Sequence, residues 1–400
     1  MSEPIFSAVY EGEGLLSWRV AHALETQVTG GELILADTPE HSFHLLRLTD
    51  EAFLYRLVRI RALIRPLPGA RADFYVHHFG YIDIAQVALT GQIVTRGPTL
   101  ALSAQTTPSG LLEIDLEFLN LHPTLSIGTA LGGTALPGAP VYAGDGAPQF
   151  ALRRIDVETR DATPHLSAVP PPERITLIDV GAQQGLQLPW MLRAPQITPI
   201  VFEPIPAEAQ ALRRTLGRIP GAAVIETALA HASGPRTLHI TDASECSSLL
   251  PPNAAFLSRY ALARYFEVVD QIEVPCARYD ALFASGLVPA PDVIKIDVQG
   301  FEYEVLLGFG ALLETCLAIE LEAQLYPLYV GQKLLGDLVA LLDTFGFVLR
   351  RLDPVDHFEG DAVEFNAFFT RRRQLIAALS QTQQRKLALV AEAWALPPYA

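Results

Sequence analysis

The stretch Ile175–Gly185, which reads Ile-Thr-Leu-Ile-Asp-Val-Gly-Ala-Gln-Gln-Gly, constrains the fold of this chain most strongly. Its apolar first half is typical of a buried strand, and the strand carries an acid, Asp179, just before two glycines, Gly181 and Gly185. Glycine is needed where the backbone turns sharply or lies close to a ligand. We therefore expect a strand that leads into a ligand-binding loop.

A second apolar run, at residues 199–202, places Glu203 at its carboxyl end. Glu203 follows Gly181 by roughly 20 residues, the offset at which an acid on the second strand meets the ribose hydroxyls of a bound nucleoside. Strand, glycine loop, helix, strand and acid is the order in which an α/β sheet holds an adenosine group. The order predicts a nucleoside-containing cofactor for the half of the chain that begins near residue 172.

The glycine loop differs from a dinucleotide-binding loop. It reads Gly-Ala-Gln-Gln-Gly rather than Gly-x-Gly-x-x-Gly, and no Lys-Ser or Lys-Thr pair follows to bind phosphate. A cofactor without phosphates is therefore favoured, and S-adenosylmethionine fits the acid on the second strand and the open loop near the first. An ordinary strand-turn-helix junction uses the same residue types, so a purely structural role stays open here. A nicotinamide cofactor is disfavoured by the missing third glycine.

Composition narrows the classes of partner. Half of the 400 residues are hydrophobic, 18% are charged and the net charge is -15, so large cores can form and a phosphate backbone is not attracted. Cys246, Cys276 and Cys316 are scattered, which suits neither a disulfide framework nor a zinc site, and the ten histidines show no metal-ligand spacing. Without a Gly-x-Ser-x-Gly elbow there is no case for a serine hydrolase. We expect a cytoplasmic protein with no membrane span, nucleic acid or metal.

The period of the hydrophobic pattern divides the chain into two parts. Between about residues 42 and 157, apolar residues alternate with polar ones, and turn clusters rich in Pro, Gly and Thr separate the runs. This alternation is typical of an all-β antiparallel sandwich, which we expect to be jelly-roll-like and assign to residues 1–157. Carbohydrate binding and oligomerisation are the two roles that we consider for it. Residues 158–173 contain four prolines and are predicted to form a linker.

After residue 174, strand-like stretches alternate with helix-like ones. This order predicts an α/β, Rossmann-like domain over residues 174–372, with a mainly parallel sheet whose ligands bind at the carboxyl ends of the strands. Residues 373–400 are expected to form a helical tail that packs on the domain or on a second copy of the chain, giving a homo-oligomer. The expected strands are 175–180, 199–203, 223–227, 236–240, 293–297, 317–321, 347–351 and 365–369, and the expected helices include 206–216, 300–307 and 333–345.

The stretch 293–302 repeats the pattern of a strand, an acid and a glycine. Asp297, Gln299 and Glu302 lie there at a predicted helix start. The helix dipole alone favours carboxylates at such a position, or else Asp297 lies over the cleft beside the cofactor or an acceptor hydroxyl.

Two further groups of polar residues follow predicted strands. Ser247 and Ser248 form either a plain turn or a pair of hydrogen-bond donors in a loop over the cleft. Glu320 and Glu322 either line the cleft or are the polar members of a strand end.

Taken in order, these pieces resemble the FkbM family of S-adenosylmethionine-dependent methyltransferases over about residues 174–372. The resemblance implies a class I methyltransferase fold, S-adenosyl-L-methionine as cofactor, and transfer of a methyl group to a hydroxyl of a sugar, glycan or related natural product. The segments that carry it are Ile178–Gly185, Phe202–Pro204, Ala228–Leu229, Ser247–Leu249, Ile294–Glu302, Glu320 with Tyr326–Tyr329, and Gly346–Phe347.

The resemblance also implies roles for individual residues. Asp297 is expected at the reacting centre as the first candidate for the general base, with Glu302 and Glu320 after it, since a carboxylate can take the proton of a sugar hydroxyl. The cofactor-binding residues that the resemblance implies are Asp179, Gly181, Gln183 and Gly185 in the first loop, Glu203 on the ribose hydroxyls, Ala228 beside the adenine, and Ser247 and Ser248 near the methionine end or the acceptor.

Three positions depart from the family pattern. Gln183 stands where the family usually has Asn, which keeps the amide, and Asn366 stands where Asp is frequent. Gln299 stands where the family often has Glu, and an amide cannot act as a base. The competing hypothesis is a non-catalytic protein that binds S-adenosylmethionine or a glycan through a degenerate methyltransferase domain.

Overall fold

The computed structural model describes residues 6–9, 19–20, 24–29, 32–37, 41–42, 44–49, 53–78, 82–96, 99–131, 142–143, 146–183 and 185–397. The chain divides into two compact units, Met1–His165 and Leu166–Ala400, and each has a hydrophobic core. Within the described ranges, no helix is long and apolar enough to cross a membrane.

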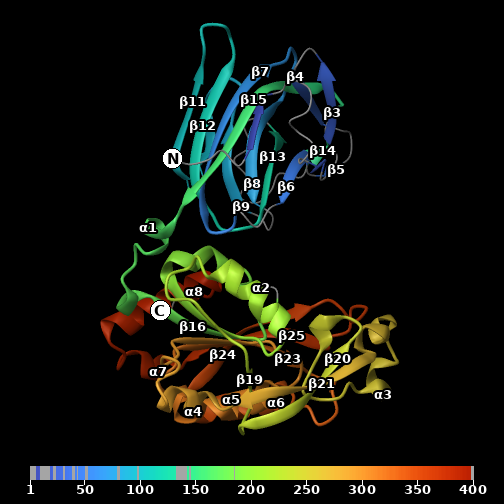
Figure 1. The fold of residues 1–400 in the computed structure, drawn as a ribbon, viewed down its shortest axis with the longest axis vertical. Coiled ribbons are helices and arrows are strands. Elements are labelled where there is room, and N and C mark those ends of the chain that lie inside the picture. Colours follow the sequence, from blue (N-terminus) through green and yellow to red (C-terminus); the bar gives the residue numbers. More distant parts are fainter. Residues whose placement is uncertain are drawn as a thin grey trace. The chain divides into compact units, whose positions relative to one another are not determined.

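The N-terminal unit is built from antiparallel strands (Figure 1). They are β1 (Phe6–Val9), β2 (Arg19–Val20), β3 (Leu24–Thr29), β4 (Glu32–Asp37), β5 (His41–Ser42), β6 (His44–Thr49), β7 (Arg56–Pro66), β8 (Ala72–His78), β9 (Ile82–Val87), β10 (Ile93–Arg96), β11 (Thr99–Thr106), β12 (Leu112–Asn120), β13 (Thr124–Leu131), β14 (Tyr142–Ala143) and β15 (Pro148–Asp161). One sheet has the order β11-β12-β7-β15-β4-β3, with β1 paired to β15, and the other has the order β10-β9-β8-β13-β6-β2.

The two sheets share one core. Alternate residues of the first sheet, such as Ile60 and Ile114, and of the second, such as Val76 and Ile127, are buried together. The period-two pattern therefore builds an antiparallel sandwich, because residues two apart in a strand point to the same face. Parts of the predicted domain, including residues 1–5 and 132–141, lie outside the described residues.

The predicted linker begins too early. The last strand, β15, continues to Asp161, so residues 158–161 lie in the sheet and pair with the start of β7. The rest of the segment contains a short helix, α1 (Thr163–Leu166), and a 3-10 turn, η2 (Pro171–Glu173). The domain boundary depends on the pairing of β15 with a strand about 100 residues earlier in the sequence. The positions of the prolines do not indicate such a long-range pairing.

The C-terminal unit has helices on both faces of a sheet (Figure 1). Its elements are β16 (Ile175–Val180), η3 (Met191–Gln196), β17 (Ile197–Phe202), α2 (Pro206–Leu216), β18 (Ala223–Ile225), β19 (Ala228–Leu229), β20 (Gly234–Thr241), η4 (Ser244–Cys246), α3 (Ala254–Leu257), η5 (Ala261–Phe266), β21 (Val268–Ala277), α4 (Tyr279–Ala284), β22 (Val293–Ile296), α5 (Glu302–Phe309), η6 (Gly310–Glu314), β23 (Ala318–Gln324), α6 (Leu335–Thr344), β24 (Phe347–Val355), β25 (Glu364–Arg371), α7 (Arg373–Ile376) and α8 (Gln381–Ala393).

The main sheet has the order β18-β17-β16-β22-β23-β25-β24. The first five strands are parallel, and β25 runs antiparallel to both of its neighbours. In Figure 1, α2 and α8 lie on one face of this sheet and α4, α5 and α6 on the other, which explains why β16 and β22 are apolar along most of their length. The strand order reverses between β16 and β22, and such sheets bind ligands beyond the carboxyl ends of the strands at that point.

Two parts of this unit differ from the prediction. The chain between β16 and β17 contains the 3-10 helix η3 where an α-helix was expected, because Pro189 and Pro195 remove backbone donors there. The predicted strand 236–240 lies in β20, which pairs with β21 in a separate small sheet of order β19-β21-β20 and not in the main sheet.

Candidate active site at the carboxyl ends of the parallel strands

The glycine loop after β16 packs directly on the loop after β22. Gly181 has a φ of 85°, and a Cβ atom there would overlap the carbonyl oxygen of Asp297. The amide of Asp297 donates to the carbonyl of Val180 at 2.9 Å, and the amide of Gly181 donates to the carbonyl of Phe202 at 3.1 Å. Only glycine fits this junction, which brings the ends of β16, β17 and β22 together.

Glu203 lies directly after β17 and is 4% exposed. Its Oε1 accepts a hydrogen bond of 2.9 Å from the amide of Ile205, and its Oε2 has no hydrogen-bond partner in the part of the chain that the structure describes. Burial raises the pKa of Glu203 to about 7. A buried carboxylate with one free oxygen is suited to accept hydrogen bonds from a diol.

Three charged residues lie side by side on neighbouring strands of the main sheet. Asp179 of β16, Lys295 of β22 and Glu320 of β23 stand in register, so their side chains share one face. Lys295 Nζ lies 3.4 Å from Asp179 Oδ1 and 3.7 Å from Asp297 Oδ2. Burial lowers the pKa of Lys295, but the carboxylates of Asp179 and Asp297 outweigh it and the net shift is upward.

Asp179 is fully buried, so the structure does not show the predicted contact of its carboxylate with a cofactor. Burial raises its pKa, and the ammonium group of Lys295 opposes that rise. Neither carboxylate oxygen has a well-aligned hydrogen bond, which leaves Lys295 as the counter-charge. Asp179 is therefore linked to Asp297 by way of Lys295, which lies near both carboxylates.

Glu320 is held by two tryptophans. Its Oε2 accepts hydrogen bonds from the indole N–H groups of Trp190, at 3.0 Å, and of Trp394, at 3.1 Å. The two rings meet edge to face with their centroids 5.8 Å apart. Burial raises the pKa of Glu320, with Lys295 opposing. These contacts attach the end of α8 to the sheet and leave Glu320 badly placed to act as a base.

Glu302 is also committed to the protein. It is 1% exposed, and its Oε1 accepts hydrogen bonds from the amides of Val298, at 3.2 Å, and Gly300, at 3.1 Å. Burial raises its pKa to about 8. The side chain holds the loop between β22 and α5, and this geometry does not favour Glu302 as a base.

Asp297 remains accessible, with 28% of its side chain exposed. The side-chain nitrogen of Gln299, Nε2, donates to Asp297 Oδ1 at 3.3 Å and to Glu322 Oε2 at 2.8 Å. Gln299 has a φ of 57°, and its carbonyl accepts a hydrogen bond of 2.7 Å from Ser248 Oγ. The amide of Gln299 thus bridges two carboxylates that would otherwise repel each other.

Two further side-chain amides, those of Gln324 and Gln332, extend the hydrogen-bond network around Glu322. Gln324 Nε2 lies 3.2 Å from both Glu322 Oε2 and Glu364 Oε1, and the side chain of Gln332 in turn donates to Gln324 Oε1. Burial, Asp297 and Glu364 together raise the pKa of Glu322 well above its ordinary value. Tyr329 Oη lies 2.9 Å from the side-chain oxygen of Gln299 and completes the network.

The other predicted cofactor residues organise the loops around the cleft. Gln183 Nε2 donates to Ser244 Oγ at 2.9 Å, which joins the glycine loop to η4. Ser247 Oγ accepts from the amide of Thr241, and Ser248 Oγ is used by Gln299 and Leu250, so both hydroxyls are committed to protein contacts. Ala228 is buried in β19, shortly after the end of β18.

Lys295, Gln324, Gln332 and Glu364 were not singled out from the sequence. Lys295 lies inside an apolar strand. Because a charged side chain is rarely buried without an opposite charge, a lysine in such a strand indicates a buried carboxylate next to it. The amides and Glu364 come from three segments whose meeting depends on the antiparallel pairing of β25 with β23. In the described part of the chain, no three His, Cys, Asp or Glu side chains are arranged to hold a metal ion.

The residues present fit S-adenosylmethionine. Glu203 has one carboxylate oxygen without a hydrogen-bond partner among the described residues, which suits the ribose hydroxyls, and the glycine loop at 181–185 follows the neighbouring strand. Gly185 also has a positive φ, 92°, and its amide closes a turn on the carbonyl of Ala182. No cation that would bind phosphate lies in this loop, which agrees with a cofactor that carries none.

Comparison with known proteins gives one family model and one curated relative. Residues 179–349 match the family model of the methyltransferase FkbM domain. The 2-O-methyltransferase NoeI of Sinorhizobium fredii is 27% identical over 181 residues, which is 44% of this chain and 73% of that protein.

Solved structures give weaker likenesses. Magnesium protoporphyrin IX methyltransferase from Synechocystis, with bound S-adenosylmethionine, shows 12% identity over 52% of this chain and 76% of its own, with a TM-score of 0.29. The xylan-binding domain CBM22-1 of Paenibacillus barcinonensis Xyn10C shows 13% identity over 40% of this chain and 95% of its own, with a TM-score of 0.25.

Proposed function

Residues 179–349 belong to the methyltransferase FkbM family, with S-adenosylmethionine as cofactor, and on this premise we propose methyl transfer to a hydroxyl of a sugar, a glycan or a related natural product. A relative that is 27% identical over 181 residues is a 2-O-methyltransferase, which supports oxygen as the methylated atom. The observation that carries the proposal is the position of Asp297. It is the accessible one of the three candidate bases, and it adjoins the cofactor loop.

The chain's own residues supply alignment and a proton acceptor. When bound, S-adenosylmethionine would supply a methyl group attached to a positively charged sulfur. An acceptor oxygen in line with that carbon–sulfur bond can take the methyl group, and the sulfur leaves as a neutral thioether. The Asp297 carboxylate takes the proton of the acceptor hydroxyl, a contribution typically worth about 10²–10⁴-fold in rate. Lys295 Nζ lies 3.7 Å from Asp297 Oδ2, and the side-chain amide of Gln299 donates to Asp297 Oδ1, which holds the carboxylate in position.

The first prediction tests Asp297. Asp297→Asn keeps the shape of the side chain and removes its basicity, so we expect methyl transfer to fall at least ~100-fold while the affinity for S-adenosylmethionine changes little. Transfer is measured with radiolabelled cofactor and a panel of oligosaccharides, and affinity by calorimetric titration. Asp353→Asn, on an exposed ion pair of β24, is the matched control and should behave as wild type.

The outcomes separate the competing hypotheses. Undiminished transfer by Asp297→Asn would remove this residue from the mechanism. Cofactor binding by the wild-type protein without transfer to any acceptor would support the non-catalytic binding protein instead. Failure to bind S-adenosylmethionine would contradict both.

For the N-terminal sandwich we propose a role in recruiting a glycan acceptor rather than forming an apolar contact between subunits. The exposed face of its first sheet carries cross-strand ion pairs such as Arg59–Asp115, at 2.5 Å, and Arg61–Glu158, at 2.8 Å. In the described part of this unit, the large exposed hydrophobic side chains are Ile93 and Leu100. A polar face of this kind suits hydroxyl groups better than a buried apolar interface.

A further inference from the structure

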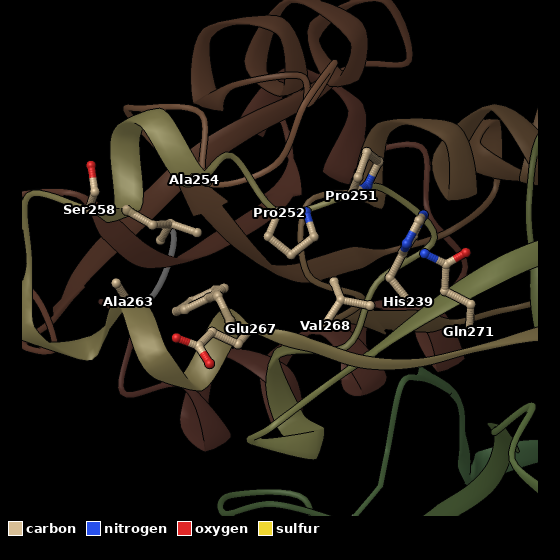
Figure 2. A pocket seen from close by; sticks show the side chains of 11 residues that line it. His239, Pro251, Pro252, Ala254, Ser258, Ala263, Glu267, Val268 and Gln271 are labelled. Atoms are coloured by element: carbon tan, nitrogen blue, oxygen red, sulfur yellow. The ribbon is translucent and has the colours of Figure 1, made fainter.

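A pocket of about 410 Å³ lies between the β20–β21 hairpin and the chain that connects its two strands (Figure 2). Its volume falls within the range of small-molecule sites, roughly 300–1,000 Å³. None of the residues assigned above to the cofactor or to proton transfer lines it. The lining combines apolar side chains with a few polar ones, and consists of His239, Pro251, Pro252, Ala254, Leu257, Ser258, Ala263, Phe266, Glu267, Val268 and Gln271.

The hairpin places two polar side chains together at one end of this pocket. His239 and Gln271 are paired residues of β20 and β21, so they project from the same face, and Figure 2 shows them side by side. Their neighbours Leu238 and Ile272 point to the opposite face and pack on the main core. Because the core fixes the hairpin, the polar pair is held in place at the pocket.

These polar groups are not used by the protein. The side chains of His239, Glu267 and Gln271 make no hydrogen bond within the described residues, and His239 Nδ1 is buried without a partner. An imidazole, a carboxylate and an amide are therefore available to a ligand. Beside them, Pro252, Phe266 and Val268 offer an apolar surface.

This combination matches the chemistry of an uncharged sugar ring. Neighbouring hydroxyls can pair with an amide and a carboxylate, while the C–H face of the ring lies on apolar side chains. The carboxylate of Glu267 and the net charge of -15 disfavour an anionic ligand. We propose that the pocket binds one sugar unit of the acceptor, an inference that rests on the proposed transfer to a sugar hydroxyl.

Two short series of contacts join the walls of the pocket to Gln299, which contacts Asp297. His239 and Ser248 exchange two backbone hydrogen bonds, of 2.9 and 3.2 Å, and Ser248 Oγ donates to the carbonyl of Gln299. On another wall, the ring of Phe266 lies 5.9 Å from that of Tyr329, whose hydroxyl contacts the side chain of Gln299. We therefore expect an oligosaccharide with one unit in the pocket to extend towards Gln299 and Asp297.

The test fills the pocket in the full-length protein. Ala263→Phe adds a ring within the pocket, Gln271→Ala removes one polar partner with less risk to folding, and Ala281→Phe adds the same ring at an exposed position of α4. The probes are cellotetraose, xylotetraose, mannotetraose and chitotetraose. Calorimetry measures their binding and that of S-adenosylmethionine, and labelled cofactor measures transfer.

We expect the wild-type protein to bind at least one tetrasaccharide. Ala263→Phe should weaken that binding and raise the KM for the sugar at least tenfold, with kcat and the affinity for S-adenosylmethionine unchanged. Gln271→Ala should weaken it about threefold or more, and Ala281→Phe should have no effect. Unchanged cofactor binding shows that each variant is folded.

Two results would overturn the pocket as a sugar site: no tetrasaccharide binds the wild-type protein, or both pocket variants bind sugar as the wild type does. A change of oligomeric state on filling the pocket would instead place a second copy of the chain there, and would also overturn it. Sugar binding that is lost in Ala263→Phe, without transfer by any variant, would support the pocket while contradicting the proposed methyl transfer.

Discussion

The carboxylates around the glycine loop differ in their hydrogen-bond and ionic partners, and the roles proposed for them rest on these differences. Glu302 and Glu320 are buried, and one oxygen of each accepts two hydrogen bonds, from backbone amides in Glu302 and from indole groups in Glu320. Asp179 contacts Lys295 in the interior. Asp297 keeps an accessible side chain at the same edge of the sheet. Gln299 is compatible with function because its amide joins two carboxylates, whereas a third carboxylate there would add like charge.

The second prediction concerns Glu203 and pH. Burial holds its pKa near 7, above the ordinary 4.5, so the protonated form is favoured in the folded protein and its contribution to stability is lost as pH rises through about 7. Ribose hydroxyls donate better to the ionised form, so we expect the Kd for S-adenosylmethionine to fall roughly tenfold between pH 6 and 8. Calorimetric titration at several pH values measures this dependence.

Glu203→Gln should weaken the binding of the cofactor and remove most of its pH dependence. Glu392→Gln, on the exposed surface of α8, is the matched control and should keep both. A variant Glu203→Gln that binds as tightly as the wild type would show that this carboxylate does not hold the ribose.

The third prediction concerns the buried pair of Lys295 and Asp179. Lys295→Met leaves the carboxylate of Asp179 buried without a counter-charge, so we expect the free energy of unfolding to fall by about 3–5 kcal/mol. Adding Asp179→Asn removes the stranded charge and should restore much of that loss. Urea unfolding at pH 7 measures both variants, and a cost below ~1 kcal/mol for Lys295→Met would contradict a paired buried charge.

Among the elements, α5 links the loop that carries Asp297 to the rest of the unit. It begins at Glu302, whose side chain holds the loop that carries Asp297, and it packs against the chain that follows β19. That packing is close because Gly308 has no side chain, and a Cβ atom there would overlap the carbonyl oxygen of Ala230. The position of α5 therefore depends on one small residue in a helix interior.

The fourth prediction compares two helical glycines. Gly308→Ala must push α5 away from Ala230, so we expect the free energy of unfolding to fall by about 1–3 kcal/mol and methyl transfer to weaken. Gly336→Ala, in the first turn of α6, meets open space and should stabilise the protein by up to ~1 kcal/mol. Denaturant unfolding measures both, and equal effects of the two substitutions would contradict the close contact at Gly308.

For the whole molecule, the chain divides into units with different architectures and separate cores. The first core joins two antiparallel sheets, and the second covers both faces of a mainly parallel sheet. The residues assigned to cofactor binding and proton transfer all lie in the C-terminal unit. The two units are therefore expected to be separable in function.

The fifth prediction is that residues 166–400 fold alone and bind S-adenosylmethionine within about threefold of the full chain, because each unit buries its own core. If the sandwich recruits the acceptor, the KM for a glycan should rise in this shorter protein while kcat is kept. Circular dichroism, calorimetry and the transfer assay measure these properties. An unchanged KM would remove the sandwich from acceptor binding.

What the sequence alone determined is local. The periods of the hydrophobic pattern predicted the antiparallel and α/β parts of the chain, and β16 and α2 have the bounds expected from apolar runs, glycine and proline. The same signals placed Asp297 and Glu203 at the ends of strands, because the residues that end a strand are neighbours in the sequence. The family resemblance rests on these local motifs and agrees with the match over residues 179–349.

Tertiary structure decided which of those residues remain available. Glu320 accepts hydrogen bonds from Trp190, 130 positions away, and from Trp394. No local sequence pattern therefore indicates that Glu320 is buried. The separate β20–β21 sheet, and the polar pair that it brings to the pocket, likewise depend on strand pairing across the fold. Burial and hydrogen bonding are properties of contacts between distant segments, and these contacts exist only after the chain has closed long loops.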